Sequence, residues 1–357
     1  MHSETVNADL GALLGACPLP LTDYKEIVLA HGSGGRLSHQ LIQKIVLPQF
    51  RNQFLDPLHD GAIFGLGETR VAFTADSYVV SPIFFPGGDI GALSIHGTIN
   101  DLAMCGARPL YLSASFILEE GLPMEHFWRI VQSMRTAADA AGVNLVTGDT
   151  KVVDRGKADK IFINTSGVGV VPPGVKIDPA RAQVGDKIII SGHVAVHGIA
   201  IMSVREGLEF ETEIASDTAA LNTLVDAMLA TKNDIHVLRD PTRGGLTSAL
   251  TEIAQSARVG MLLNEALIPI SEEVKGACEI LGLDPLYVAN EGKLLAIVAA
   301  RDVDPVLSAM KSHVLGQQAA VIGEVTPDHP GLVMMKTRIG GTRVVDMLSG
   351  EQLPRIC

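Results

Sequence analysis

The chain alternates strand-like and helix-like segments along its whole length, and this alternation is the feature that most limits its possible folds. In the first half, β-branched runs predict strands and apolar spacing predicts helices at 70–76, 93–105, 124–141 and 161–171. The second half repeats the mixture, with segments of both kinds at 187–191, 218–230, 246–257, 294–300 and 303–313. Such alternation favours an α/β or α+β fold over an all-α or all-β fold.

Turn signals divide the chain into expected domains. Its 357 residues suggest about two domains, since a single domain usually has about 150 residues. Pro172-Pro173-Gly174 is the strongest turn signal near the middle, and we place the domain boundary there. We therefore expect an irregular N-terminal extension at 1–30, a first domain at 31–173 and a second domain at 174–335. A flexible glycine-containing tail is expected at 336–357.

The overall charge argues against two classes of partner. The chain carries 28 basic and 40 acidic residues, which gives a formal net charge of −12. An acidic surface repels nucleic-acid phosphates and anionic lipid, so we expect no nucleic acid and no membrane surface as partners. Apolar runs such as 294–300 are far too short to cross a membrane, and no lysine or arginine precedes Lys25. We therefore expect no signal peptide and a cytoplasmic location.

The four cysteines are far apart, and one of them ends the chain. Cys17, Cys105, Cys278 and Cys357 form no C-x-x-C pair, so we expect neither a disulfide framework nor a zinc site. Cys357 follows a glycine-containing segment that would let its thiol reach a partner or fold back into the protein. Arg355 would favour the thiolate, whereas the adjacent terminal carboxylate opposes it. The alternative is a terminal residue without a role.

Four aspartates follow apolar runs or begin turns, in the company of glycine, threonine or asparagine. They are Asp60, Asp76, Asp101 and Asp149. Carboxylates at strand ends can meet at one edge of a sheet, where they would provide the oxygen ligands that Mg²⁺ prefers. Each aspartate taken alone is equally well explained as a helix cap or turn residue. The four together favour a nucleotide and metal site.

Glycine-rich turns offer a place for phosphate. No Walker loop or kinase signature is present. Gly32-Ser33-Gly34-Gly35 could instead bring backbone N–H groups close to phosphate, although many such segments are only turns. Segment 240–246 places an acid, Arg243 and backbone amides together, and a turn that enters a helix also explains it. His193 and His197 could share a helix face, but without a third ligand they are more simply satisfied histidines.

Several of these segments resemble motifs of the aminoimidazole-ribonucleotide-synthetase superfamily. They are Gly32-Ser33-Gly34-Gly35, Asp76-Ser77, Asn100-Asp101-Leu102-Ala103-Met104-Cys105-Gly106-Ala107-Arg108-Pro109, Gly148-Asp149-Thr150-Lys151 and Asp240-Pro241-Thr242-Arg243-Gly244-Gly245-Leu246. The ending Pro354-Arg355-Ile356-Cys357 resembles that of one branch, the HypE family of hydrogenase-maturation carbamoyl dehydratases. The resemblance covers about residues 30 to 357.

The resemblance implies a fold and an activity. The expected fold is PurM-like, with an N-terminal α+β domain whose strands form a β-barrel shared across a homodimer, a C-terminal α/β domain and a mobile tail. ATP and Mg²⁺ are the expected cofactors. A partner carbamoyltransferase, HypF, would place a carbamoyl group on Cys357. ATP-dependent dehydration would turn this group into a thiocyanate, whose cyanide passes to iron on the HypC–HypD complex for the nickel–iron hydrogenase centre.

The resemblance also suggests roles for single residues. We expect Cys357 as the substrate thiol, with Glu291 and Lys151 handling protons and orientation. The metal ligands would be Asp76, Asp101 and Asp149. The residues expected around the nucleotide are Gly32, Ser33, Gly34, Gly35, Asp60, His96, Asn100, Thr150, Asp240 and Arg243.

Competing interpretations remain at this point. Glu291 could be a solvated surface acid, and Lys151 could belong to a structural ion pair. The chain could be another ATP-dependent synthetase or kinase of the superfamily, although none of these explains a terminal cysteine. It could also be a thiol carrier without catalytic activity, against which the set of carboxylates argues.

Overall fold

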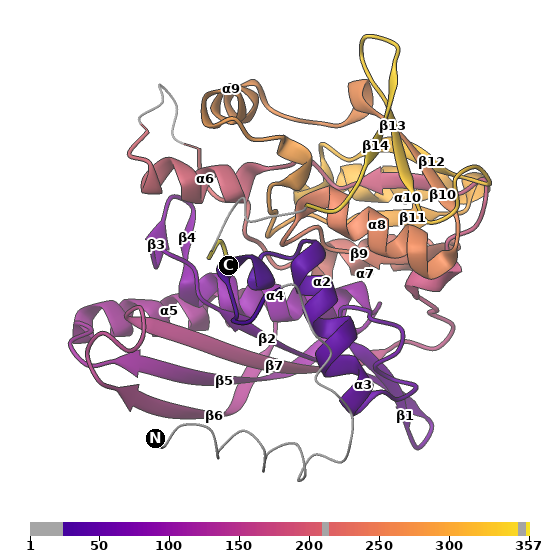
Figure 1. The fold of residues 1–357 in the computed structure, drawn as a ribbon. Helices are drawn as coiled ribbons and strands as arrows, with labels where there is room; N and C mark the ends of the chain where they lie inside the picture. The colour runs from indigo at the N-terminus through magenta and orange to yellow at the C-terminus, as the bar shows by residue number, and fades with distance from the viewer. Residues whose placement is uncertain (1–23, 209–213, 349–354) are drawn as a thin grey trace, which may run out of the picture.

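The computed structural model describes residues 24–208, 214–348 and 355–357, and Figure 1 shows how they are arranged. The expected N-terminal extension therefore lies mostly outside the described residues, as do parts of the expected tail. In the described part of the chain, no helix combines the length and apolar character that a membrane span needs. The three cysteines described, Cys105, Cys278 and Cys357, are free thiols.

The first half of the chain forms a five-stranded sheet, the first sheet, with the order β1-β2-β7-β5-β6. All its neighbouring strands are antiparallel except β5 and β6, which are parallel. Its strands are β1 (Ala62–Leu66), β2 (Thr69–Tyr78), β5 (Arg108–Glu119), β6 (Asn144–Val153) and β7 (Ile161–Val171). A short hairpin of β3 (Phe84–Phe85) and β4 (Gly88–Asp89) precedes the helix that follows β2.

Two helices, α4 (Ile90–Met104) and α5 (Met124–Ala141), cover the side of the first sheet that faces the second half (Figure 1). Alternate residues of the strands, such as Leu112 and Ile163, are buried against them, as period-two side-chain alternation requires. The opposite face, which we call the open face, carries half-exposed apolar side chains. Phe73, Val168 and Tyr111 lie in one row across it, paired from strand to strand.

Helix α4 lies between the first sheet and the second half of the chain (Figure 1). The Asp89 side chain caps its N-terminus by accepting hydrogen bonds from the amides of Gly91 at 2.8 Å and Ala92 at 3.0 Å. The helix is buried on nearly every side, including Leu93, Ile95 and Ile99. A helix buried all round can present polar groups to an interior site, and this one carries His96, Asn100 and Asp101.

The second half forms a seven-stranded sheet with the order β14-β13-β10-β12-β8-β11-β9. Its strands are β8 (Lys187–Ile190), β9 (Ile235–Arg239), β10 (Gly260–Asn264), β11 (Leu295–Val298), β12 (Ala320–Thr326), β13 (Val333–Lys336) and β14 (Thr342–Val345). The longer helices around it are α6 (Val196–Arg205), α7 (Asn222–Ala230), α8 (Gly245–Ala257), α9 (Glu272–Leu281) and α10 (Val303–Ser312). Two apolar cores lie on its two faces, because Ile188 and Ile190 pack with α8 while Ile189 packs with α7 and α10.

Short helical turns complete the fold. The N-terminal ones are η1 (Leu29–Gly32), α2 (Arg36–Leu41), the π-helical turn η2 (Ile42–Val46) and α3 (Leu47–Phe50). The remaining ones are η3 (Pro179–Arg181), η4 (Glu265–Leu267), η5 (Pro285–Tyr287), η6 (Ala300–Asp302) and η7 (Val314–Gly316).

The structure confirms the predicted mixture of helices and strands in both halves. The proposed boundary at Pro172-Pro173-Gly174 falls directly after β7 and before η3. The expected flexible tail overlaps β14, which pairs with β13, so ordered structure continues beyond residue 335. Residues 355–357 lie where the C-terminus is marked in Figure 1, with Ile356 buried and with Arg355 and Cys357 half-buried.

Candidate active site

Three aspartates from distant parts of the chain meet between the two halves of the molecule. Asp60 precedes β1, Asp101 lies near the end of α4, and Asp240 follows β9. One carboxylate oxygen from each lies within 4.8 Å of the others. We call this cluster the carboxylate trio. It contains two residues that we expected at the nucleotide, Asp60 and Asp240, and one expected metal ligand, Asp101.

The trio concentrates negative charge in a place that excludes water. Burial raises the pKa of Asp101, and repulsion from Asp240, Asp76 and Asp60 raises it further. Burial likewise raises the pKa of Asp240, to about 8. Thr74 opposes part of the rise in the pKa of Asp101, because its Oγ1 donates a hydrogen bond to Asp101 Oδ2 at 2.7 Å. The raised pKa values of Asp101 and Asp240 mean that a cation bound beside them would favour their ionised forms.

The donor set fits a hard divalent cation. Asp60 Oδ2 is buried without a hydrogen-bond partner among the described residues. Three carboxylates with an unsatisfied oxygen form the kind of oxygen cage that Mg²⁺ completes with phosphate oxygens and water. Asp60, Asp101 and Asp240 are therefore the residues of this chain that could hold such an ion.

Arg239 is a buried cation beside the trio, and our sequence reasoning missed it. Its Nε lies 3.0 Å from Asp60 Oδ1, and its guanidinium also pairs with Glu252 on α8. Glu252 Oε1 in turn lies 3.5 Å from His39 Nδ1 on α2. An arginine that ends the buried strand β9, directly before Asp240, was the available signal.

The other two expected metal ligands are not part of the trio, although Asp76 is near enough to raise the pKa of Asp101. Asp76 is half-buried on β2, where its Oδ1 accepts a hydrogen bond from the Ser77 amide at 2.7 Å. Asp149 lies on the edge strand β6 with its side chain 61% exposed, paired with Lys151 Nζ at 2.6 Å. The hydrogen bond from Lys151 and that from the Thr150 amide lower the pKa of Asp149. Within one chain, the structure therefore keeps Asp149, Thr150 and Lys151 away from the carboxylate trio.

The two glycine-rich motifs pack against each other. Gly34 has φ +75°, and a Cβ there would lie 2.5 Å from the Cβ of Arg243. A Cβ on Gly244 would likewise lie 2.8 Å from the Gly34 carbonyl oxygen, which accepts a hydrogen bond from Ser248 Oγ at 2.9 Å. Only glycine allows both the left-handed backbone and this close approach. The motifs thus join the N-terminal turn to the start of α8.

Asn100 and His96 on α4 bind the second half. Asn100 Nδ2 donates to the carbonyls of Ala219 at 3.0 Å and Glu291 at 3.2 Å, and its Oδ1 accepts from Leu221. His96 Nδ1 lies 3.0 Å from the hydroxyl of Thr218. Burial lowers the pKa of His96 to about 4, so the ring is neutral at pH 7. Both residues position the segments that carry Glu291, and their contact with a nucleotide stays a prediction.

The terminal thiol lies beside a buried acid and a buried cation. Burial raises the pKa of the Cys357 thiol, and the nearby Arg243 guanidinium opposes this shift. Glu291 is only 3% exposed, and its Oε1 has no hydrogen-bond partner in the described part of the chain. Burial raises the pKa of Glu291, with added repulsion from Asp240, Asp76 and Asp217. The thiol, the acid and the trio thus share one electrostatic environment.

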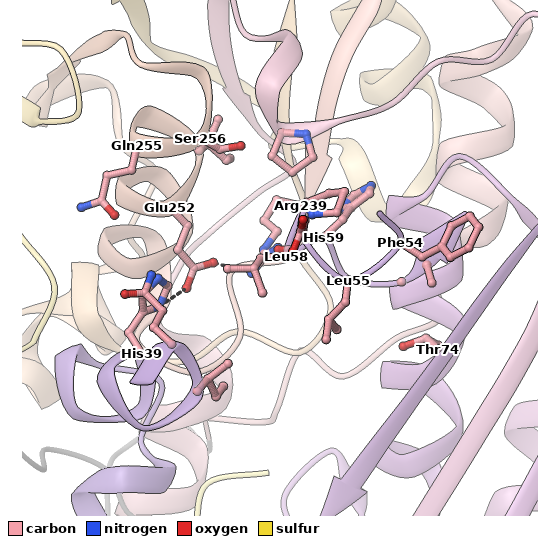
Figure 2. Close-up of a pocket in the computed structure, with 18 of the residues that line it drawn as sticks. His39, Phe54, Leu55, Leu58, His59, Thr74, Arg239, Glu252, Gln255 and Ser256 are labelled. Atoms are coloured by element: carbon pink, nitrogen blue, oxygen red, sulfur yellow. Dashed lines mark hydrogen bonds and ion pairs between the residues drawn. The ribbon is translucent and has the colours of Figure 1, made fainter. Parts of the chain in front are cut away.

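A cavity of about 530 Å³ opens next to Asp60 (Figure 2). It lies between α2, the segment before β1, β2 and α8, and its walls include Phe54, Leu55 and Leu58. His59 lines it with a side chain only 5% exposed, and neither ring nitrogen makes a hydrogen bond to a described residue. An apolar space with a few unsatisfied polar groups is the usual character of a small-molecule site.

Comparisons with known proteins agree with this architecture. Residues 58–171 match the N-terminal domain of the AIR synthase related proteins, and residues 183–335 match their C-terminal domain. The chain is 58% identical over 332 residues to the carbamoyl dehydratase HypE of Cupriavidus necator, an alignment that covers 93% of this chain and 95% of that protein.

Solved structures give the same result. A crystal structure of a HypE–HypF complex contains a chain with a TM-score of 0.82 and 45% identity, covering 86% of this chain and 99% of that one. A hydrogenase maturation protein HypE solved in complex with ATP has a TM-score of 0.79 and 48% identity, covering 93% of this chain and all of that one. The chain therefore belongs to the HypE family of carbamoyl dehydratases, within the AIR synthase related proteins.

Proposed function

We propose that this protein is an ATP-dependent carbamoyl dehydratase of hydrogenase maturation that acts on its own terminal cysteine. The observation that carries the proposal is the position of Cys357, half-buried near the buried Glu291 and Arg243 and within the field of the carboxylate trio. A protein that only carried the thiol to partners would not need buried acids beside that thiol.

The reaction removes an oxygen that is a poor leaving group. The carbonyl oxygen of the Cys357 S-carboxamide attacks the γ-phosphorus of ATP, the bond to the β-phosphate oxygen breaks, and ADP leaves. The nitrogen loses one proton at this stage and a second one as the C–O bond breaks, the C≡N bond forms and phosphate departs. The products are the thiocyanate of Cys357, ADP, phosphate and two released protons.

The carboxylate trio is our proposed metal site, in place of the set Asp76, Asp101 and Asp149. Mg²⁺ held there would neutralise and orient the phosphates of ATP. Asp60 would coordinate the ion while Arg239 holds that carboxylate from its other oxygen. The cavity beside Asp60 has room for the base and sugar of the nucleotide, with Phe54, Leu55 and Leu58 as apolar walls.

Glu291 is our proposed proton acceptor. Its raised pKa makes the ionised carboxylate a stronger base than a solvated one, and Arg243 favours that ionised form. Its unsatisfied oxygen is free to accept a proton from the carboxamide nitrogen. Arg243 would also attract the phosphate as it leaves.

We propose that a homodimer completes the site. The open face of the first sheet exposes Tyr111 and Phe73, and Phe73 also lines the cavity. A second copy packed on this face would cover the apolar row and bring its own β6 towards the cavity. Asp149, Thr150 and Lys151 would then serve the partner's nucleotide.

Exchange with partners requires that the tail move. We propose that HypF carbamoylates Cys357 in an outward position, and that the cyanide later passes to the HypC–HypD complex. The solved HypE–HypF complex of relatives supports HypF as the partner. ATP would favour the inward position, because its phosphate meets the modified thiol only there.

Intact mass spectrometry tests the function. The protein carbamoylated at Cys357 should lose the mass of one water when ATP and Mg²⁺ are added, and the variant Cys357→Ala should show neither the carbamoyl mass nor the loss. An ATP analogue whose γ-phosphate cannot be transferred is the control. If ATP leaves the carbamoyl mass unchanged, the protein is a carrier and the proposal is wrong.

A further inference from the structure

The last three residues are held by far more than their terminal sulfur. The Ser81 amide donates to the carbonyl of Arg355 at 3.2 Å, and the Val79 amide donates to Cys357 O at 3.0 Å. These contacts join alternate residues of the tail to alternate residues of the segment after β2. These two hydrogen bonds fix the register of the tail along the segment 79–81.

Helix α6 of the second half holds the other side of the tail. His197 Nε2 lies 2.8 Å from the carbonyl oxygen of Ile356, which can only accept, so Nε2 carries the proton. His197 Nδ1 then accepts from the hydroxyl of Ser216 at 2.7 Å. Arg205 donates to the carbonyls of both Arg355 and Ser81, and so bridges the tail and the segment beside it.

The side chains of the tail are recognised as well. The Arg355 guanidinium pairs with Asp159, which lies in the loop between β6 and β7. Ile356 is 3% exposed and belongs to the apolar core of the first half. Arg355 itself has φ +54°, a left-handed conformation that a residue with a side chain adopts only when its surroundings impose it.

We propose that Asp159, His197 and Arg205 form a tail clamp that selects the ending Arg-Ile-Cys and sets the position of the terminal sulfur beside Glu291. Asp159 recognises the charge of residue 355, the core of the first half recognises Ile356, and His197 and Arg205 fix the backbone. A tail longer or shorter by one residue would move the sulfur out of this register, by up to about 3.5 Å. The clamp residues are positioning residues, and their catalytic effect rests on the proposed function.

The alkylation rate of Cys357 measures how firmly the clamp holds the tail, and the measurement does not require catalysis. The full-length protein is treated with iodoacetamide, and the rate at Cys357 is followed by mass spectrometry of the C-terminal peptide. The docked thiol is protected, so we expect Asp159→Ala to raise this rate about two- to fivefold, since partly exposed ion pairs are weak. His197→Ala, which removes a buried hydrogen bond, should raise it about tenfold. Asp154→Ala, in the same loop as Asp159, is the matched control and should leave the rate unchanged.

Charge exchange separates recognition from folding. Asp159→Arg and Arg355→Asp should each release the tail, and the double variant should restore protection towards the wild-type rate. His197→Gln, which can still donate to the Ile356 carbonyl, should recover part of the protection lost in His197→Ala. Equal alkylation rates in all clamp variants, with thermal unfolding unchanged, would overturn the clamp.

A second readout links the clamp to chemistry. In carbamoylated protein at saturating ATP, the single-turnover loss of water should slow in Asp159→Ala and His197→Ala, while the Kd for ATP stays the same. If the wild-type protein loses no water with ATP, the proposed function is wrong, yet the alkylation series still decides the clamp. If dehydration proceeds at the wild-type rate in variants whose tail is released, the clamp does not position the sulfur and that part of the proposal is wrong.

Discussion

Two acidic sites that we expected to serve the same nucleotide have opposite surroundings. Asp240 in the carboxylate trio is 6% exposed, and burial raises its pKa to about 8. Asp149 on β6 has a side chain 61% exposed, and its hydrogen bond with Lys151 lowers its pKa. One site gathers negative charge that nothing in the chain fully balances, whereas the other is already balanced by its own lysine.

The two sites differ in whether their carboxylate oxygens have hydrogen-bond partners. Asp60 Oδ2 is buried and makes no hydrogen bond among the described residues, with His59 Nδ1 3.4 Å away, and a buried oxygen without a hydrogen bond costs free energy. An exposed ion pair costs and gains little in solution. In the account proposed above, a cation completes the trio, and a second copy on the open face gives Asp149 and Lys151 their role.

Asp240→Asn should cause the largest loss. Removing one charge from the trio weakens the metal site that stabilises the transferred phosphate, so we expect ATP-dependent dehydration to fall by at least about 100-fold. The single-turnover rate at increasing Mg²⁺ measures this, and high Mg²⁺ should recover part of it. Asp226→Asn, an exposed acid paired with Arg108, is the control and should keep the wild-type rate. An equal loss of dehydration activity in Asp240→Asn and Asp226→Asn would contradict a special role for the buried acid.

The sequence predicted the local structure well, and it identified the acidic residues without showing which of them lie close together. The segments 124–141 and 161–171 coincide with α5 and β7, because their apolar periodicity is a local property. The aspartates after apolar runs were also identified. Which of them meet depends on the sheet order, and β6 lies at an edge, so Asp149 could not be assigned from its neighbours in the chain.

Contacts between distant residues were outside the reach of the sequence. Asp159 and Arg355 are 196 positions apart, and neither stands in a pattern that names the other. The role of Arg239 was hidden for a similar reason, since it pairs with Asp60 and Glu252 from other elements. Folding brings these charges together by packing that no short motif encodes.

Mixing two impaired variants should show whether Asp149 serves the partner chain. Asp149→Asn alone should lower dehydration by about tenfold, since it removes one charged hydrogen-bonding group from the site. When Asp149→Asn and Asp240→Asn chains are mixed and allowed to exchange, half of the dimers are mixed, and each has one intact site. About a quarter of the wild-type activity should therefore return.

The mixing experiment can also contradict a role of Asp149 in the partner chain. If Asp149 acts within its own chain, mixed dimers have no intact site and no activity returns above the average of the two variants. An unmixed equimolar pair of samples, assayed separately and summed, is the baseline.

The smallest expected effect is on the pH dependence of stability, which should differ between His96 and the exposed Asp149. Burial lowers the pKa of His96 to about 4, below that of an exposed histidine, so the unfolded chain binds this proton more readily than the folded one. The stability that His96 contributes is present above about pH 6.5 and is lost as the pH falls towards 4. His96→Gln should flatten the fall of the urea midpoint between pH 7 and 5. Asp149→Asn should leave that profile unchanged, because its exposed ion pair is screened by solvent. An identical slope in wild type and His96→Gln would contradict this assignment.

The most direct test of the central claim follows the oxygen atom that the reaction removes. Carbamoyl groups labelled with ¹⁸O are placed on Cys357 by the carbamoyltransferase partner, and the labelled protein is incubated with Mg²⁺ and ATP. If the carboxamide oxygen attacks the γ-phosphorus, the label appears in inorganic phosphate, one atom for each thiocyanate formed. Label found in water, or phosphate released without label while the thiocyanate forms, would contradict the account.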